Sequence, residues 1–161
     1  MSFTPEEAYN IAIRYLKGEN IKIIYSKESK KIANGESYYS PLENEIKIPS
    51  SEVALNSKEV YFLSTVFHEC IHSTMKALKR ECGTNEEDYA FEELVAEIGA
   101  TMLMNKVSFN NERVNIVLAS KQVCYLSCWK SKISSEDKNL RKAQNLAKEA
   151  VEYILNKGGK L

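Results

Sequence analysis

The pattern His-Glu-Cys-Ile-His at residues 68–72 constrains this chain more than any other feature, and it contains both of the chain's histidines. In an α-helix, residues four apart lie on the same face, so the imidazoles of His68 and His72 can hold one metal ion together. Glu69 lies between them, where its carboxylate can take a proton from a water molecule that the metal activates. If the segment is helical, the pattern predicts a catalytic zinc site with Glu69 as general base.

The residues around the pattern have the periodicity of an amphipathic helix. Apolar side chains recur at steps of three and four. They are Val60, Leu63, Phe67, Ile71, Met75 and Leu78. Ser57 is a suitable N-cap, and Glu59 would follow it in the first turn. We therefore expect a helix over about residues 58–79, and a pair of histidines that merely packs at an interface is the alternative.

A second acidic segment offers the third ligand that a catalytic zinc ion usually has. Residues 89–100 read as a helix for which Asn85 is a suitable N-cap. Glu93 and Glu97 lie four residues apart on one face among apolar neighbours, where burial of an unpaired carboxylate is unfavourable. We predict Glu93 as the third zinc ligand and Glu97 as the hydrogen-bond partner of a zinc-binding histidine.

The remaining residues of this segment have simpler expected roles. Glu92 points about 100° away around the helix and is expected to be a solvated or capping carboxylate. Ala96, Gly99 and Ala100 are small enough to let another helix approach closely. The alternative for the whole segment is an acidic, exposed helix face, which the nearby histidine pattern disfavours.

Several stretches together resemble one known family, the zincin-type metallopeptidase domain of ArdC-like antirestriction proteins and of phage and plasmid polyvalent proteins. The stretches are Tyr39-Ser40-Pro41, 45–49, 67–74, 89–100, Trp129-Lys130 and the helix expected from Ser135. The resemblance covers about residues 38–155. It implies a zincin fold, zinc on His68, His72 and a glutamate of the second helix, and Glu69 as the catalytic base.

The chain departs from that family in two places. Family members usually follow the second histidine with Thr-Gly-His, whereas this chain has Ser73-Thr74-Met75. The end of the helix after the histidines can therefore differ. The antirestriction proteins also carry an N-terminal DNA-binding domain, which the first 30 or so residues are too few to replace. Binding of single-stranded DNA is therefore not part of what the resemblance implies.

Length and charge fit one small domain over residues 1–161. The 22 basic and 22 acidic residues balance, whereas a nucleic-acid-binding domain is more often strongly basic. No apolar run reaches membrane-spanning length and no signal-peptide pattern is present, so we expect a cytoplasmic protein without a membrane partner. Cys124 and Cys128 lie one helical turn apart and are expected to pack in the core, since zinc binding by them would need two further ligands.

The order of expected elements indicates an α+β fold, zincin-like, with a small, mostly antiparallel sheet and about four helices. Helices are expected over 5–17, 58–79, 86–107 and 111–132, with a last one that Ser135 begins and Gly158 follows. A strand is expected over 21–25, a turn at Asn34-Gly35, and a hairpin of 37–40 with 45–48.

Two expectations concern substrate contact. The strand 45–48, ended by Pro49, is a candidate edge strand that pairs with an extended peptide, and the alternative is a plain edge protected by Lys47 and Pro49. Tyr38, Tyr39 and Tyr89 are candidate donors to an oxyanion, although tyrosines more often serve in packing.

These features favour a zinc-dependent metallopeptidase that hydrolyses peptide bonds of a peptide or protein substrate, in a phage, plasmid or other mobile-element system. Glu69 would act as base and then as proton donor to the leaving amine. The alternative is a non-catalytic antirestriction or protein-interaction module that keeps the zinc site for structure. A nucleic-acid-binding function is disfavoured by the neutral net charge.

Overall fold

The structure, a computed structural model, describes residues 2–27, 36–56, 60–81, 83–109, 119–120, 123–124, 127, 131 and 137–159. From the N-terminus its elements are α1 (Pro5–Gly18), β1 (Lys22–Ser26), β2 (Tyr38–Ser40), β3 (Glu45–Pro49), α3 (Ser51–Ala54), α4 (Phe62–Ser73), α5 (Glu86–Met104) and α7 (Asp137–Gly158). The expected α+β class is confirmed.

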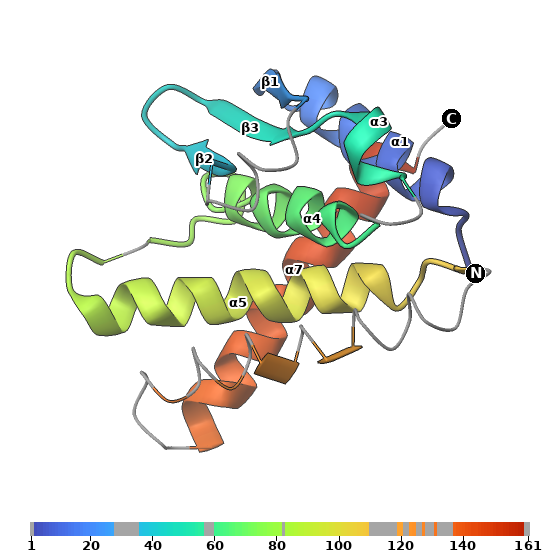
Figure 1. Cartoon of the computed structure of the whole chain (residues 1–161). Helices are drawn as coiled ribbons and strands as arrows, with labels where there is room; N and C mark the ends of the chain where they lie inside the picture. Colours follow the sequence, from blue (N-terminus) through green and yellow to red (C-terminus); the bar gives the residue numbers. More distant parts are fainter. Residues whose placement is uncertain are drawn as a thin grey trace.

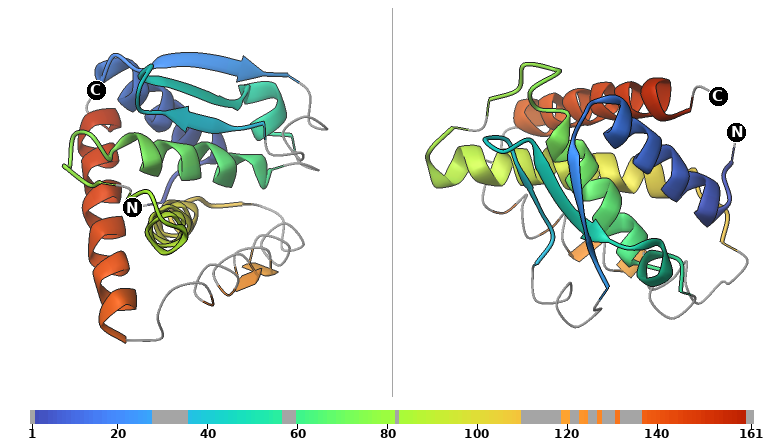
Figure 2. Two further views of the ribbon diagram at one scale, coloured as in Figure 1. Left: turned by 90° about the vertical axis from the view of Figure 1, so that its left-hand side faces the viewer. Right: turned by 90° about the horizontal axis from the view of Figure 1, so that it is seen from above.

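The elements form stacked layers. The sheet lies above α4, and α5 lies below it (Figure 1). Figure 2 shows α5 end on in its left view, with α7 running past both α4 and α5 on one side. A single buried hydrophobic cluster contains residues of α1, β3, α4, α5 and α7. The helix that carries the two histidines is therefore held between the sheet and α5.

Helix α1 begins where the sequence predicts, because its start is determined locally. The Thr4 hydroxyl accepts a hydrogen bond from the Glu7 backbone at 3.2 Å, and the Glu7 carboxylate accepts one from the Thr4 backbone at 2.7 Å. This capping box satisfies two donors that a helix start leaves free, and Pro5 at the first position lacks one. The buried face of α1 packs on α4 and α7.

The sheet is mixed, where a mostly antiparallel one was expected. β2 and β3 form the predicted antiparallel hairpin, in which Tyr38 pairs with Lys47 and Ser40 with Glu45. β1 pairs with β3 in parallel over the whole of both strands. Asn44, with φ of 49°, lies in the turn that reverses the chain. The chain runs one way in β1, the opposite way in β2 and the first way again in β3. β1 and β3 therefore point in the same direction and pair in parallel.

The prediction that residues 45–48 form the edge strand was wrong. The strand order is β1-β3-β2, so β3 is the central strand and β2 lies at an edge. Ile46 and Ile48 are fully buried, which agrees with a strand that is covered rather than open. The parallel pairing with β1 joins segments distant in sequence, and nothing in the local pattern of β3 indicates it.

Helix α4 ends earlier than predicted. Its regular part ends at Ser73, and residues 74–79 form turns instead of two more helical turns. Ser73 and Thr74 each donate a side-chain hydrogen bond to a carbonyl of the last turn, at 2.7 Å in both cases. Lys79 then has φ of 52°, which reverses the chain direction. The predicted cap at Ser57 and Glu59 lies outside the described residues.

Helix α5 is capped at Asn85 as predicted and ends at Met104, slightly before the expected end near Val107. The Asn85 side chain accepts a hydrogen bond from the Asp88 backbone at 2.8 Å. The helix packs against α4 on one side and α7 on another. Both of those contacts bury its apolar residues, and Ala96 is among those that are fully buried.

Helical periodicity predicts an inner face of α7 that begins at Leu140, and that face is buried except at Leu140, which is partly buried. The buried residues are Ala143, Ala147, Ala150, Val151 and Ile154. Its C-terminal end is tied to α1, because Arg14 donates a hydrogen bond to the Gly158 carbonyl at 2.6 Å. The expected N-cap Ser135, most of the expected helix 111–132, the turn at Asn34-Gly35 and the Trp129-Lys130 stretch lie outside the described residues.

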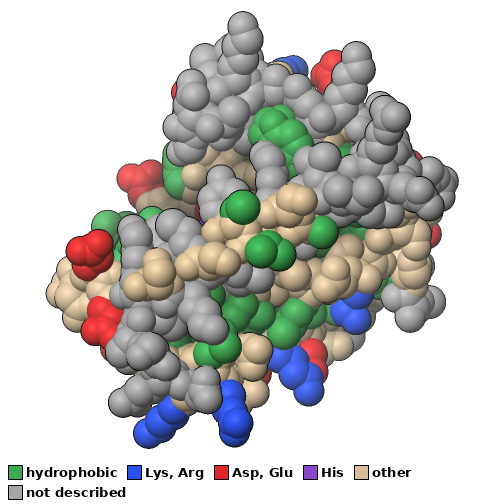
Figure 3. Space-filling model, turned by 60° about the horizontal axis from the view of Figure 1, so that its bottom comes forward, with side chains coloured by type: hydrophobic (Ala, Val, Ile, Leu, Met, Phe, Trp, Pro, Cys, Tyr) green, Lys and Arg blue, Asp and Glu red, His purple; other side chains and the backbone are tan. Residues whose placement is uncertain are grey.

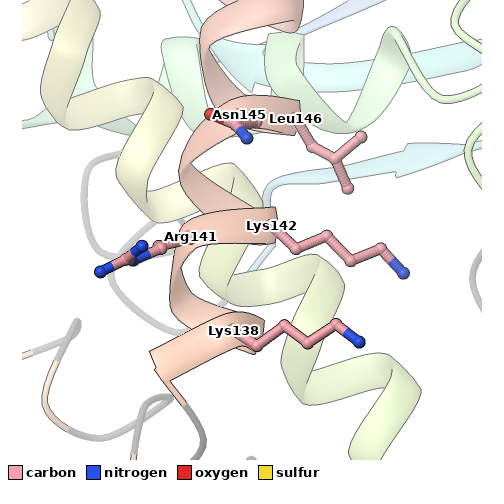
Figure 4. Close-up of a pocket in the computed structure, with 5 residues that line it drawn as sticks. All are labelled: Lys138, Arg141, Lys142, Asn145 and Leu146. Atoms are coloured by element: carbon pink, nitrogen blue, oxygen red, sulfur yellow. The ribbon is translucent and has the colours of Figure 1, made fainter.

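The outer half of α7 borders a hollow of about 610 Å³ whose described lining contains no histidine, cysteine or acidic side chain. Figure 4 shows the residues that line it, which are Lys138, Arg141, Lys142, Asn145 and Leu146. Figure 3 views the molecule from beneath and shows hydrophobic side chains across the middle of that face, with Lys and Arg toward its lower rim.

Two further sequence expectations can be compared with the described residues. Cys124 is exposed, so the expected core packing is wrong for this residue, whereas Cys70 is buried. Cys128 lies outside the described residues. None of the described helices combines the length and the apolarity that crossing a bilayer requires.

Candidate metal centre

A cleft of about 320 Å³ lies between strand β2 and the helices α4 and α5. α4 contributes His68, Glu69 and His72, and α5 contributes Glu93. The structure thus brings together the side chains that the sequence singles out for metal binding and proton transfer. They meet because the i and i+4 histidines face α5, which crosses beneath α4.

The two histidines and Glu93 form a compact donor set. The Nε2 atoms of His68 and His72 lie 3.1 Å apart. Glu93 places Oε2 3.4 Å from the first of these nitrogens and Oε1 3.4 Å from the second. Ligand atoms held tetrahedrally at about 2.0–2.1 Å from zinc are about 3.3–3.4 Å from one another. The spacing of these donors therefore fits a zinc ion.

Each histidine also contacts a carboxylate through its other ring nitrogen. Nδ1 of His68 lies 3.2 Å from Oε2 of Glu97, and Nδ1 of His72 lies 3.2 Å from Oε1 of Glu92. A proton on Nδ1 can be donated to each carboxylate, which leaves the lone pair of Nε2 directed at the cleft. This arrangement is typical of metal-binding histidines.

The expectation that Glu92 is solvated was wrong. Its side chain is only 6% exposed, and it forms an ion pair with Arg80 at 2.8 Å. Arg80 folds back from the segment after α4 and covers the face of α5 that the sequence suggested was open. Helical geometry separates Glu92 and Glu93 by about 100°, but both long side chains still reach His72.

Sequence reasoning missed Arg80 altogether. The signal that could have identified it is the acidic pair at 92–93 in a helix whose other faces are apolar. Two adjacent carboxylates in such a helix need a cation or a metal each if both are buried. A bound metal would account for one of them, and a nearby basic residue such as Arg80 for the other.

Glu69 is buried in the cleft wall, with 7% of its surface exposed. Burial raises the pKa of Glu69 above its usual range, although His68 and His72 act in the opposite direction. A hydrogen bond from the backbone of Tyr39 on β2 also favours the ionised carboxylate. A carboxyl group with a raised pKa in a cleft is suited to accept and return a proton near neutral pH.

Glu93 and the two histidines stabilise one another's charged forms, which shifts their pKa values. Burial alone would raise the pKa of Glu93, but hydrogen bonds from His68 and His72 outweigh it and hold that pKa well below its usual range. Burial alone would lower the pKa of His68, yet hydrogen bonds to Glu93 and Glu97 raise it to about 10. Glu93 is thus present as an anion, which is the form that binds metal, whereas His68 must lose a proton before its Nε2 can bind.

The three tyrosines proposed as oxyanion donors all line the cleft. The Tyr38 hydroxyl donates to Glu45 at 2.9 Å, and the Tyr39 hydroxyl donates to Asn44 at 3.3 Å. Both hydroxyls are therefore engaged away from the metal centre. Tyr89 on α5 is half exposed at the cleft mouth.

A family model described as a zincin-like metallopeptidase matches residues 19–145, which include every residue of the metal centre. The chain belongs to this zincin-like family. Zinc is the metal that the family's fold implies, and the donor set of this zincin-like domain fits it, because two imidazole nitrogens and a carboxylate converge within 4.8 Å.

One solved structure has a fold similar to that of this domain. The chain is similar to the crystal structure of the antirestriction ArdC protein from the R388 plasmid, in its Mn(II)-bound form, with a TM-score of 0.58 and 22% identity. The match covers 93% of this chain and 52% of that chain, so the zincin-like domain spans about half the length of that protein. A comparison with curated proteins found no match.

Proposed function

We propose that the chain is a zinc-dependent metallopeptidase that hydrolyses peptide bonds in a phage, plasmid or other mobile-element system. The observation that carries this proposal is the position of Glu69. Its buried carboxylate shares one cleft with the donor set of His68, His72 and Glu93. A site that only held a metal for structure would need no proton acceptor beside an open position.

The residues have separate roles in this proposal. His68, His72 and Glu93 would hold zinc, and Glu97 would orient the ring of His68. Bound zinc supplies Lewis acidity for the scissile carbonyl and for the attacking water. Glu69 takes the proton of that water and then delivers it to the leaving amine.

An extended peptide or protein segment is the substrate that suits this cleft. β2 borders the cleft through Tyr38 and Tyr39, and it is an edge strand of the described sheet. An extended chain can add to such an edge through main-chain hydrogen bonds. The likeness to an antirestriction protein supports a mobile-element role in the cytoplasm, and the balanced charge argues against nucleic acid as the substrate of this domain.

The test compares the wild-type chain with Glu69→Gln, which removes the base but preserves side-chain size. Both proteins are loaded with zinc and incubated with a proteome, and new peptide termini are profiled by mass spectrometry. Wild type should produce termini that Glu69→Gln produces at least about 100-fold more slowly. Equal cleavage by the two proteins, or none by a zinc-loaded wild type across varied proteomes, argues against a peptidase.

The second candidate function is a non-catalytic antirestriction or protein-interaction module with a structural zinc site. The solved structure with a similar fold is described as an antirestriction protein and not as a peptidase, which motivates this second candidate. A shared fold does not by itself imply catalysis. A restriction-protection assay in cells separates the two. Protection that survives Glu69→Gln but is lost on removal of a metal ligand supports the interaction module.

A further inference from the structure

The guanidinium of Arg80 joins the end of α4 to α5 through four hydrogen bonds. It is bidentate on Glu92, with Nη2 at 2.8 Å and Nε at 3.2 Å from the two carboxylate oxygens. It also donates to the Thr74 hydroxyl at 2.7 Å and to the Ile71 carbonyl at 2.9 Å. The Arg80 side chain is only 4% exposed, so these bonds form away from solvent.

These bonds converge on the surroundings of one histidine. Ile71 directly precedes His72, and the Glu92 oxygen that Arg80 holds at 2.8 Å is the same Oε1 that contacts Nδ1 of His72. Arg80 therefore fixes both the backbone that carries this ring and the carboxylate that it faces. The buried ion pair of Arg80 and Glu92 has few alternative geometries, so it restricts the rotation of the His72 ring.

We propose that Arg80 and Glu92 are positioning residues that fix the His72 ring, with Nδ1 protonated and Nε2 directed at the metal position. This inference rests on the proposed metal site. In this proposal, zinc affinity depends on Arg80, whose hydrogen bonds go to Glu92, Thr74 and Ile71 and not to a metal ligand. Glu92 thereby orients the ring of His72, as Glu97 orients the ring of His68, and Arg80 holds Glu92 in place.

The geometry requires a guanidinium rather than a positive charge alone. A guanidinium presents its donors in a planar fork that can bind a carboxylate with two of them and direct the others elsewhere. A lysine ammonium cannot bridge Glu92, Thr74 and the Ile71 carbonyl in the same way. Arg80→Lys therefore preserves charge and removes the anchoring.

The experiment compares Arg80→Lys and Glu92→Gln with wild type and with a control, Arg14→Lys. Arg14 ties α1 to the end of α7 and lies on elements that do not line the cleft. Zinc affinity is measured by competition with a chelator. The imidazole nitrogens are observed by ¹⁵N NMR, in which this chain gives signals from only two histidines.

Both test variants should bind zinc roughly 10- to 100-fold more weakly, the loss that is typical when the partner of a ligating histidine is removed. The Nδ1 proton signal of His72 should shift or exchange faster, while the signals of His68 stay in place. Arg14→Lys should leave zinc affinity and both histidines unchanged. If zinc affinity and the His72 signals are unchanged in folded Arg80→Lys and Glu92→Gln, the positioning role is refuted.

Two further measurements keep the outcome clear. If wild type binds no zinc, the proposed function fails, but the Nδ1 proton of His72 in the metal-free protein still tests the positioning role against Arg80→Lys. If both variants unfold, Thr74→Val removes only one acceptor of Arg80. That variant should shift the His72 signals in the same direction by a smaller amount, and unchanged signals would refute the proposal.

Discussion

Gly99 on α5 faces Ile71 on α4 so closely that a Cβ at position 99 would lie 2.6 Å from Cδ1 and 2.8 Å from Cγ1 of Ile71. No ordinary carbon contact is this short, so a side chain at position 99 would force Ile71 or one of the two helices to shift. His68 and His72 lie on one of these helices and Glu93 on the other. The spacing of the metal donors therefore depends on this contact.

Gly99→Ala should consequently destabilise the fold by about 1–3 kcal/mol, the usual effect of overpacking a core. It should also weaken zinc binding if the clash is relieved by movement of α4 against α5 rather than by the Ile71 side chain alone. Urea unfolding and chelator competition measure the two effects. Gly18→Ala is the matched control, since nothing lies within 4 Å of a Cβ there, and it should be neutral or slightly stabilising. A Gly99→Ala protein as stable as Gly18→Ala would contradict the argument.

Three of the glutamates of α5, Glu92, Glu93 and Glu97, should differ in their effect on metal binding. Glu93→Ala removes a donor atom and should weaken zinc binding most. Glu92→Ala and Glu97→Ala each leave a histidine Nδ1 without its carboxylate and should weaken binding roughly 10- to 100-fold. The exposed Glu86→Ala in the first turn serves as control. Isothermal titration ranks the four, and a silent Glu92→Ala would show that its contact with His72 has no role in binding.

Removal of metal should lower thermal stability. We expect about one zinc ion per chain, bound to the folded state only, because the three donors come from two separate helices. At free zinc about 100-fold above Kd, binding adds about 2.7 kcal/mol, or about 5–10 °C in Tm for a chain of this size. Melting curves with and without a chelator, together with native mass spectrometry, measure this. A chain that stays metal-free in excess zinc has no such site.

Lys79 ends the turn after α4 with φ of 52°, a conformation that side chains other than glycine adopt at a cost of about 1–2 kcal/mol. Lys79→Gly should relieve that strain and be neutral or up to about 1 kcal/mol more stable. Lys79→Val should be destabilised by more than 1 kcal/mol, since a β-branched residue fits this conformation poorly. Urea denaturation distinguishes them, and equal stability of the two variants would contradict this reading of the turn.

Features that depend on neighbours in sequence were predictable. Thr4 and Pro5 predict the start of α1, because capping involves residues three apart. The face shared by His68 and His72 follows from helical period alone. The sequence also indicated Glu93 and Glu97 as one face of a second helix, and the structure places both beside the histidines.

Features that depend on distant partners were not predictable in this way. The parallel pairing of β1 with β3 and the burial of Glu92 under Arg80 both join segments through the folded chain. The early end of α4 is of the same kind, because Arg80 binds the Ile71 carbonyl that a longer helix would have used. Local propensity favoured continuation, and tertiary hydrogen bonding determined the end.

Because synthesis runs from the N-terminus to the C-terminus, α1 is made long before α7, against which it packs. The metal donors all lie within residues 68–93, so they emerge from a ribosome long before α7, which packs against both α5 and α1. The bond from Arg14 to Gly158 joins residues 144 positions apart in the sequence. A nascent chain thus holds every proposed zinc ligand, and α4 against which α1 packs, while the part of α1 that α7 covers is still exposed.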